Sequence, residues 1–387
     1  MNKKELELYI HIPFCVRKCS YCDFLSAPAT EQTREAYMAA LFAEIGGRAK
    51  DYSDRTVTSI FIGGGTPSLL SGEQIGQLMD RIREQFAMAQ DAEITMEVNP
   101  GTASAEKLRN FYTAGINRLS IGMQSAQAEE LKNLGRIHDF EGFCQVYREA
   151  VEAGFTNINV DVMSGLPGQT LASYRDTLEK VLHLEPMPQH ISAYSLIVEE
   201  GTPFAAMAAR GELPLPEEET ERAMYEETIE VLAKCGFHRY EISNYARDGY
   251  ECRHNVGYWI RRDYLGFGIG AASLIDNVRF QNEKSLGAYL AHPLESREEE
   301  QTLTVQDRME ETMFLGLRLT RGVSCVDFAE QYGRTVEEVY GEVIARNVAD
   351  GLLTVTERKE NQKKDRFLAL TKRGLDLSNY VMAQFLF

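Results

Sequence analysis

The chain of 387 residues lacks two features that would place it in large classes of protein. It has no apolar run of about 20 residues, the length that a membrane span requires. It is also poor in basic residues, with 41 Lys and Arg against 58 Asp and Glu and a formal charge of −17. Nucleic-acid-binding proteins need a basic surface, so neither a membrane span nor nucleic acid as a partner is expected. The first residues show no apolar core of a signal peptide, and we expect a cytoplasmic protein.

Cysteine is scarce as well, because the chain has only seven. Three of them, Cys15, Cys19 and Cys22, lie together in a loop after a predicted strand. Thiols that stay free in such a cluster fit a reducing compartment and suit metal binding. The other four are scattered, without the spacing of a disulfide framework: Cys144, Cys235, Cys252 and Cys325.

The spacing of Cys15, Cys19 and Cys22 lets three thiolates converge on one inorganic centre. Thiolates are soft ligands, and they select iron–sulfur clusters, zinc or copper(I). A structural zinc site is closed by four protein ligands, and an electron-carrying cluster usually takes four cysteines. Three cysteines on a [4Fe–4S] cluster leave one iron open to another ligand. We therefore favour a cluster with an open iron over a zinc site completed by His11 or by a remote cysteine.

Strand and helix patterns alternate through the first 235 residues. Regular alternation of this kind predicts a parallel sheet with right-handed crossovers, either open or closed into a barrel, and six units are two short of the eightfold barrel. The predicted strands are Leu6–Ile12, Val57–Ile62, Glu93–Val98, Arg118–Gly122, Asn157–Val162 and His190–Leu196. The predicted helices that follow them are Thr33–Lys50, Ser71–Phe86, Ala103–Thr113, Phe140–Ala153, Leu171–Leu184 and Glu217–Lys234.

The pattern changes after residue 235. Residues 236–295 show no further βα unit, which predicts an irregular segment packed on the first region. Residues 296–302 are polar and acidic and are expected to form a linker. Residues 301–387 predict a smaller α+β domain that resembles a winged helix, and its balanced charge favours a solvated wing over a DNA-binding one. Its predicted elements are helices at Met309–Leu319, Cys325–Tyr332, Val336–Asp350 and Lys372–Leu386 and a hairpin of Leu352–Thr356 with Phe367–Leu370.

The cysteine run is typical of a known superfamily. Cys15-Val-Arg-Lys-Cys19-Ser-Tyr-Cys22, with an aromatic residue before the last cysteine, resembles the motif of the radical S-adenosylmethionine (SAM) superfamily. This resemblance implies that the amino and carboxylate groups of SAM chelate the open iron of a [4Fe–4S] cluster. It also implies that residues 1–235 form an incomplete (β/α)6 barrel, in agreement with the six predicted units.

Polar residues gather where the predicted strands end. Glu97, Gln124 and Asp161 lie at the ends of the third, fourth and fifth strands, and Arg136 lies in the loop after Gln124. Ligands of parallel α/β folds collect at the carboxyl ends of the strands. A zwitterionic amino acid joined to a ribose needs an anionic partner, a cationic partner and acceptors for the ribose hydroxyls. The planar guanidinium of Arg136 suits the carboxylate of such a ligand. An ordinary loop salt bridge could explain each residue alone, but their common position favours one ligand site.

A narrower resemblance covers nearly the whole chain. Several segments are similar to the oxygen-independent coproporphyrinogen III oxidase group: Tyr9–Cys15, Gly63–Pro67, Glu97–Pro100, Gln124–Ser125, Arg136 and Asp161–Gly168. The resemblance implies that Cys15, Cys19 and Cys22 hold the cluster, and Tyr21 takes the place of a Phe in that oxidase's cofactor site. It further implies a set of residues around SAM: Tyr9, Tyr21, Gly64, Gly65, Thr66, Glu97, Gln124, Arg136 and Asp161.

Two differences separate the chain from this oxidase. The oxidase pattern has a fourth cysteine two residues after the third, where this chain has Phe24, and it has a long extension before the cluster. The motif His254-Asn255-Val-Gly-Tyr258-Trp259, together with three clustered cysteines, instead resembles the HemW family of heme chaperones. This resemblance implies a protein that binds heme, a [4Fe–4S] cluster and SAM and delivers heme to a recipient such as a respiratory cytochrome. The alternative is the oxidase itself, which decarboxylates coproporphyrinogen III through a SAM-derived radical.

The motif suggests how heme would be bound. Histidine is a common axial ligand of heme iron, so His254 is the expected ligand, with Asn255 orienting its ring. Tyr258 and Trp259 can lie against the flat macrocycle, and Cys252 is the next candidate for the iron. The alternative is that His254 is a core histidine and Trp259 a packing residue. The heme recipient and the oligomeric state, a homodimer included, stay open.

Replacement of Cys15, Cys19 or Cys22 with Ala is expected to abolish the cluster, because no fourth clustered thiol can replace a lost ligand. Iron and sulfide per chain after anaerobic reconstitution measure the effect. Variants at the four scattered cysteines are expected to keep the full iron content. A scattered cysteine that proved necessary would contradict the open-iron interpretation.

Overall fold

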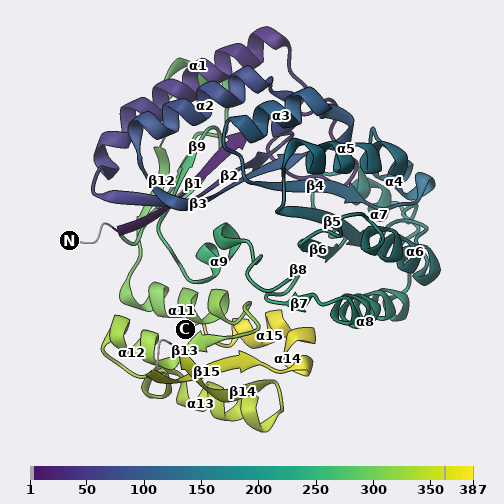
Figure 1. Ribbon diagram of the computed structural model, residues 1–387. Helices are drawn as coiled ribbons and strands as arrows, with labels where there is room; N and C mark the ends of the chain where they lie inside the picture. The colour runs from purple at the N-terminus through teal and green to yellow at the C-terminus, as the bar shows by residue number, and fades with distance from the viewer. Residues whose placement is uncertain (1–3, 296, 361–362, 387) are drawn as a thin grey trace.

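The structure is a computed structural model that describes residues 4–295, 297–360 and 363–386. One sheet of 12 strands curves through the molecule, with helices on its outer side (Figure 1). The predicted (β/α)6 arrangement is confirmed, because six central strands are parallel neighbours in sequence order. They are β1 (Lys4–Ile12), β2 (Arg55–Gly64), β3 (Ala87–Val98), β4 (Arg118–Gln124), β5 (Ile158–Ser164) and β6 (His190–Ser195).

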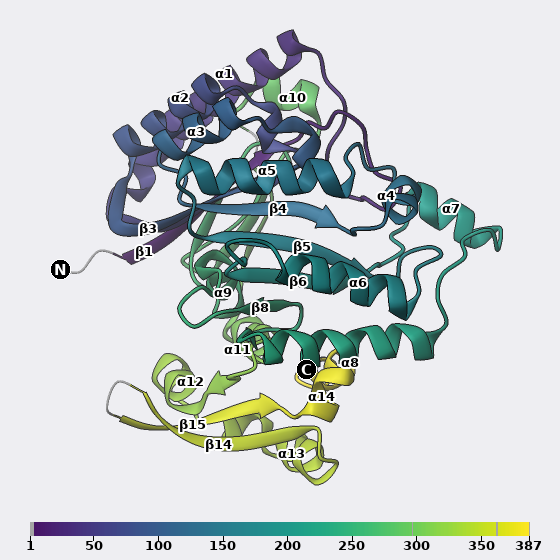
Figure 2. The ribbon, with the colours of Figure 1, turned by 45° about the vertical axis from the view of Figure 1, so that its right-hand side comes forward.

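The connecting helices cover the outer face of the sheet (Figures 1 and 2). Their main members are α1 (Glu31–Arg48), α2 (Gly72–Gln85), α3 (Ala105–Thr113), α5 (Phe140–Ala153), α6 (Leu171–Leu182) and α8 (Glu218–Lys234). Two short helices were not predicted, α4 (Ala128–Leu134) and α7 (Pro203–Ala209), and they lie in the loops after β4 and β6. A capping box begins α2, since the Ser71 hydroxyl accepts the Gln74 N–H and the Gln74 side chain accepts the Ser71 N–H.

The two faces of the central strands differ in polarity. Alternate residues of β1 from Leu6 to Ile12 are fully buried in the main hydrophobic core, which also contains the apolar face of α1. The residues between them, Glu7, Tyr9 and His11, point into the barrel, as the period of two in a strand requires. The other strands follow the same rule, and their inward residues include buried polar side chains: Ser59, Thr95, Ser120 and Asn159. The barrel interior is therefore polar.

Residues 236–302 are more regular than expected. Short strands extend the sheet at both edges, with β7 (His238–Arg239) and β8 (Asn244–Ala246) beside β6. At the other edge β9 (Tyr264–Phe267) pairs with β1, and outward from it follow β10 (Ala272–Ile275), β11 (Val278–Asn282) and β12 (Arg297–Thr302). The predictions for this region were therefore wrong: the expected irregular segment (236–295) contains short strands, and the expected linker (296–302) contains β12. Residue 296 itself lies outside the described residues. The shortest of these strands, with two or three residues, cannot show a periodic pattern, and β12 has no apolar residue to alternate with its polar ones.

Two helices of this region lie on different sides of the sheet. α9 (Arg253–Trp259) lies between the barrel and the C-terminal domain, where it contacts β2 and a helix of that domain (Figure 1). α10 (Leu286–Ala291) packs against α1 on the outside. Within the part of the chain that the structure describes, the edge strands β7 and β12 are not neighbours. The barrel is therefore incomplete.

The C-terminal region is a smaller α+β unit with its own hydrophobic core. Its sheet has the order β13-β15-β14, and it lies below the barrel near α8 and α9 (Figure 2). The single last helix predicted at Lys372–Leu386 is two short helices. No helix in the described ranges is long and apolar enough to cross a membrane. The elements are α11 (Val305–Gly316), β13 (Val323–Ser324), α12 (Cys325–Tyr332), α13 (Val336–Ala349), β14 (Leu353–Glu360), β15 (Lys363–Leu370), α14 (Lys372–Asp376) and α15 (Ser378–Ala383).

A buried carboxylate ties α1 to the strands that follow β8. The Glu44 side chain accepts hydrogen bonds from the Tyr289 hydroxyl (2.7 Å), the Asn282 amide (2.8 Å) and the Gly268 N–H (2.9 Å). Arg48, one turn along α1, pairs with Glu44 at 2.8 Å. Burial raises the pKa of Glu44, and Arg48 and the three donors oppose this effect. This cluster holds β9 to β11 against α1.

Glu44→Ala is expected to lower the free energy of unfolding by about 3–5 kcal/mol, because it removes one member of a buried ion pair and leaves several donors without their acceptor. Urea denaturation followed by circular dichroism measures the loss. Glu35→Ala, at an exposed position of the same helix, is the control and should stay within about 0.5 kcal/mol of wild type. Equal stability of the two variants would contradict the anchoring role of Glu44.

Candidate functional site

A cavity of about 570 Å³ opens at the carboxyl ends of the central strands. The three clustered cysteines line it, and parallel pairing explains why residues so distant in sequence meet at one rim. Asn255, predicted at the heme site, also lines this cavity. Most of the residues predicted around SAM are found here: Tyr21, Gly64, Gly65, Thr66, Glu97, Gln124, Arg136 and Asp161.

The cysteine loop, residues 13–27, is closed by its own backbone. The Cys15 N–H donates to Ala27 O (3.1 Å), and the Ala27 N–H donates to Pro13 O (3.0 Å). The Arg17 guanidinium donates to Gly135 O at 2.6 Å, in the loop after α4. The three thiols of the loop are half-buried and line the cavity. The loop therefore keeps its shape through backbone contacts and leaves its sulfur atoms for a ligand.

Two donors approach the sulfur atoms from the barrel. The Thr66 hydroxyl donates to Cys15 Sγ at 3.4 Å, and an Arg136 N–H reaches Cys19 Sγ at 4.0 Å. Three soft sulfur atoms with such donors fit a cluster held by three cysteines. In residues 4–295, 297–360 and 363–386, no three His, Cys, Asp or Glu side chains are arranged to hold a single metal ion. His11 lies outside this cavity, so a zinc site completed by His11 is not supported.

Gly65 lies directly against the base of the cysteine loop. Its N–H donates to Ile12 O at 2.9 Å. A Cβ added at Gly65 would lie 2.7 Å from Ile12 O and 2.8 Å from Phe14 N, both backbone atoms. Only glycine allows this close approach, so part of the Gly63–Gly65 run is required by the packing of the loop.

Two carboxyl groups lie on the barrel side of the cavity. The Glu97 carboxylate accepts the Gly64 N–H at 3.0 Å. Burial and the nearby Asp161 raise the pKa of Glu97 to about 7. Burial also raises the pKa of Asp161, although the Asn159 amide donates to this carboxyl at 2.6 Å. Both groups are ready to accept hydrogen bonds from a polar ligand.

Arg136 and Gln124 complete the polar wall. Arg136 donates to Gly122 O at 2.5 Å, and its buried Nε has no hydrogen-bond partner within the described residues. Gln124 ends β4 in a left-handed backbone conformation (φ 71°), which a residue other than glycine rarely adopts. Its side-chain oxygen accepts the Tyr194 hydroxyl at 3.1 Å. An unpartnered guanidinium N–H in the same cavity as two carboxyls fits a ligand that carries both charges, as the amino acid end of SAM does.

Several residues of this cavity were not predicted. Asn159, Ser192 and Tyr194 line it from β5 and β6, and Asn244 lines it from β8. The alternation of apolar and polar residues in β5 and β6 could have predicted that Asn159, Ser192 and Tyr194 face the barrel interior. Asn244 belongs to a strand of three residues and carries no such signal.

A second cavity of about 520 Å³ lies beside the first, since Phe24, Gly64 and Glu97 line both. The structure places Tyr9, predicted beside SAM, in this second cavity together with His11. The reason is that Tyr9 lies in the middle of β1, farther from the cysteine loop than the residues at the strand end. The two cavities are therefore neighbours in the same barrel.

The second cavity is shared between the barrel and the C-terminal domain. Leu315 of α11 contributes to its wall. Arg261 and Arg279 line it too, and each pairs with Glu311 of α11 at 2.8 Å. Its other wall residues are mostly aromatic or apolar: Leu25, Tyr258, Trp259, Tyr264, Gly270, Ala272 and Leu274. An apolar cavity with two arginines suits a flat ligand that carries carboxylates.

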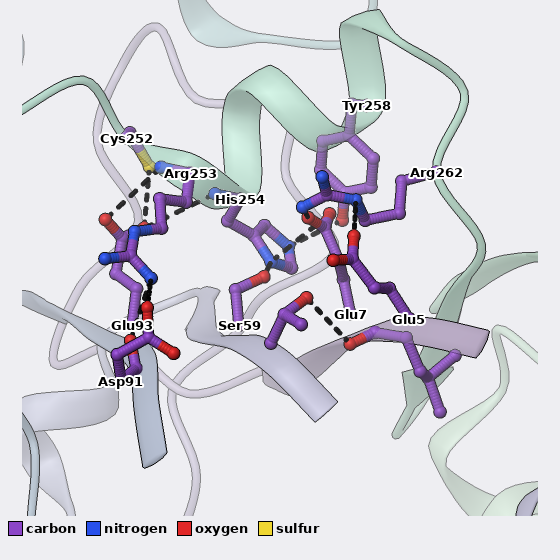
Figure 3. A network of polar contacts seen from close by, with 12 residues as sticks. Glu5, Glu7, Ser59, Asp91, Glu93, Cys252, Arg253, His254, Tyr258 and Arg262 are labelled. Carbon is purple, nitrogen blue, oxygen red and sulfur yellow. Dashed lines mark hydrogen bonds and ion pairs between the residues drawn. The ribbon is translucent and has the colours of Figure 1, made fainter. Parts of the chain in front are cut away.

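His254 faces neither cavity. The residue is only 1% exposed, and its ring lies between Ser59 Oγ (2.8 Å from Nδ1) and the Tyr258 hydroxyl (3.0 Å from Nε2), as Figure 3 shows. Burial, with Arg118 and Arg262 nearby, lowers the pKa of His254 to about 3. The structure does not show the expected histidine open to heme, because both ring nitrogens already have partners. The alternative of a satisfied core histidine describes this structure.

Two further residues of the motif region also differ from expectation. Asn255 lines the first cavity and does not orient the His254 ring, a role that two hydroxyl groups take. Cys252 is fully buried, with its thiol 3.5 Å from a Glu93 carboxylate oxygen, and burial raises the pKa of the thiol to about 12. A buried neutral thiol is not available to heme iron in this structure.

Comparison with known protein families agrees with this geometry. The family model of the radical SAM superfamily matches residues 9–181, and that of the HemN C-terminal domain matches residues 303–377. The structure of coproporphyrinogen III oxidase (HemN) from Escherichia coli, a radical SAM enzyme, matches with a TM-score of 0.84 and 27% identity, covering 100% of this chain and 91% of that chain. The fold is therefore that of a radical SAM protein with a HemN-type C-terminal domain.

Relatives of similar length narrow the class. The heme chaperone HemW of Lactococcus lactis is 36% identical over 387 residues, which cover 100% of this chain and 98% of that protein. HemW of Bacillus subtilis is 38% identical, with 98% of both chains covered. HemW of Escherichia coli is 37% identical, with 90% of this chain and 92% of that protein covered. The chain belongs to the HemW family.

Gly65→Ala is expected to displace the cysteine loop and to lower the iron content after anaerobic reconstitution well below that of wild type. Iron and sulfide analysis of the purified protein measures this loss. Gly76→Ala in α2 is the matched control, because a Cβ at Gly76 has no atom within 4 Å. The control should keep its iron and gain about 0.5–1 kcal/mol of helix stability. Equal iron content in the two variants would contradict the packing argument.

Proposed function

We propose that this protein is a cytoplasmic heme chaperone that binds heme, a [4Fe–4S] cluster and SAM and delivers heme to recipients such as respiratory cytochromes. The observation that carries the proposal is the aromatic second cavity, which lies next to the cysteine-lined cavity and shares Phe24, Gly64 and Glu97 with it. The names of the three full-length relatives in sequence support it, since all three are called heme chaperones.

The first cavity is the proposed site of the cluster and SAM. Cys15, Cys19 and Cys22 would hold the cluster, which supplies an iron open to a further ligand when it is bound. Arg136 is proposed to pair with the carboxylate of SAM through its planar guanidinium, and Glu97 to accept hydrogen bonds from the ribose hydroxyls. The remaining proposed contacts are Tyr21, Gly64, Gly65, Thr66, Gln124 and Asp161.

The second cavity is the proposed heme site. Tyr258 and Trp259 offer ring faces to the macrocycle, and an aromatic pair is worth about 0.5–1.5 kcal/mol beyond its buried area. Arg261 and Arg279 lie on the same wall, where guanidinium groups suit the propionates of heme. Both arginines also bond to Glu311, so the propionates would compete with this carboxylate. Such competition suits a cargo that is held and then released.

The alternative function is the coproporphyrinogen III oxidase reaction. The observation in its favour is the structural match to that enzyme over the whole chain, with a TM-score of 0.84. Against it, Phe24 replaces the fourth cysteine of the oxidase pattern. Phe24 is 57% exposed where the two cavities meet, so this replacement lies between the proposed cluster and heme sites.

Two measurements on the anaerobically reconstituted protein separate these functions. Added hemin is expected to give a saturable Soret band, and a variant with Tyr258→Ala and Trp259→Ala should bind hemin more weakly. With coproporphyrinogen III, SAM and a reductant, we expect no protoporphyrinogen and no stoichiometric 5′-deoxyadenosine. Formation of both products would establish the oxidase, and a wild-type protein without hemin binding would overturn the chaperone proposal.

The affinity for SAM is expected to fall as the pH drops from about 8 to about 6. The ionised carboxylate of Glu97 accepts hydrogen bonds from hydroxyls more strongly than its protonated form, and its pKa is raised to about 7. The ionised fraction of a group with this pKa falls about tenfold over that range. Equilibrium dialysis with labelled SAM measures the change. Glu97→Gln should bind SAM more weakly and show a flat profile, and an unchanged slope in this variant would assign the titration to another group.

A further inference from the structure

The short helix α9 forms part of the wall of both cavities. Its Asn255 lines the first cavity, and its Tyr258 and Trp259 line the second. A helix of seven residues has little stability of its own, so neighbouring elements must hold it in place. The contacts that fix α9 therefore set the shape of both cavities.

Glu93 of β3 holds the beginning of α9. Its carboxylate accepts the N–H groups of Arg253 (3.2 Å) and His254 (3.3 Å), which have no partner inside the helix. The Cys252 thiol donates to the same carboxylate at 3.5 Å. Figure 3 shows Glu93 near the first residues of the helix and Tyr258 near its other end. Contacts at the first residues alone do not fix the orientation of the α9 axis relative to the sheet.

His254 supplies the contact that sets this direction. Its ring joins Ser59 of β2 to Tyr258, one turn farther along α9, through both ring nitrogens. The ring also stacks on Phe61 of β2, with ring centres 5.3 Å apart and an angle of 29° between the planes. One side chain therefore fixes the helix on β2 and orients the Tyr258 ring of the second cavity.

Glu7 of β1 packs against the same helix at Gly257. A Cβ at Gly257 would lie 2.0 Å from Glu7 Oε1, so glycine is needed for this approach. Glu7 also pairs with Arg262, just after α9, at 3.2 Å, and its other oxygen lies 3.8 Å from His254 Nδ1. The helix is thus held by β1, β2 and β3 together (Figure 3).

We propose that His254 is a positioning residue and not a ligand of heme iron: it fixes α9 so that Asn255 faces the first cavity and Tyr258 faces the second. That the two ligands are SAM and heme rests on the proposed function. The contacts of His254 that carry the proposal are within the protein and do not depend on either ligand. A change that loosens α9, even one remote from both cavities, should weaken binding in both of them. Loss of an axial ligand would instead affect heme alone and change its spectrum.

Ser59→Ala is the sharpest test, because Ser59 bonds to His254 and lines neither cavity. Hydrogen–deuterium exchange of the amides of residues 253–259 in the ligand-free protein is expected to increase. The affinities for hemin and SAM should fall together by about two- to tenfold, the loss expected for one buried hydrogen bond. Thr58→Ala is the matched control, since Thr58 is the neighbouring residue of β2 and bonds to Leu6 O. It should change neither affinity.

Substitutions of His254 itself separate positioning from ligation. His254→Ala should weaken both affinities more than Ser59→Ala does, while the heme that still binds keeps the Soret position of wild type. His254→Asn keeps a polar group near the position of Nδ1 and should recover part of the exchange protection and SAM affinity. A shifted Soret band in both His254 variants, with unchanged affinities in Ser59→Ala, would make His254 the ligand and overturn the proposal. Unchanged amide exchange in all three variants would overturn it as well.

Failure of the proposed function gives a different result. A wild-type protein that bound no hemin would remove the heme assignment of the second cavity. The amide exchange and the SAM affinity of the Ser59 and His254 variants would still decide whether His254 positions α9.

Discussion

The parallel pairing of β1 to β6 is the constraint on which both cavities depend. Because all six strands run in the same direction, their last residues meet at one rim, and the cysteine loop after β1 joins them there. The outer helices bury the apolar face of each strand and leave the inner face to polar residues such as Ser59 and Asn159. A polar interior can hold a charged ligand at the rim and can fix α9 by hydrogen bonds.

The elements that could be predicted are those whose own residues show a periodic pattern or a cap. The six βα units were found because each strand is followed by a helix of two or more turns, with a cap such as Ser71 before α2. The strands from β7 to β12 have two to six residues, and their pairing with neighbouring strands, outward from β1 and β6, defines them. The expected linker over 296–302 shows the same limit. Its acidic residues form the edge strand β12, whose described side chains are all exposed, so composition alone resembles a loop.

Part of the candidate site could likewise be predicted from local sequence signals, and part of it could not. The first cavity could be predicted from local signals, namely the cysteine spacing and the residues at strand ends, because only the strand direction is needed to bring them together. The second cavity could not, since Tyr9 reaches it from the middle of a strand and Leu315 from another domain. The motif that contains His254 and Tyr258 predicted candidate residues but not which way their side chains point. The partner of His254 on β2 lies 195 positions earlier in the chain.

The C-terminal domain contributes to one cavity and not to the other. Every residue that lines the first cavity precedes residue 256. Leu315 of α11 lines the second cavity, and Glu311 of α11 pairs with Arg261 and Arg279 on the wall of that cavity. Arg318 also lies over the Trp259 ring, 4.4 Å from its centre. The shape of the second cavity therefore depends on where this domain sits, whereas the lining of the first cavity does not. The molecule therefore has one cavity built by a single domain and a second cavity built by two.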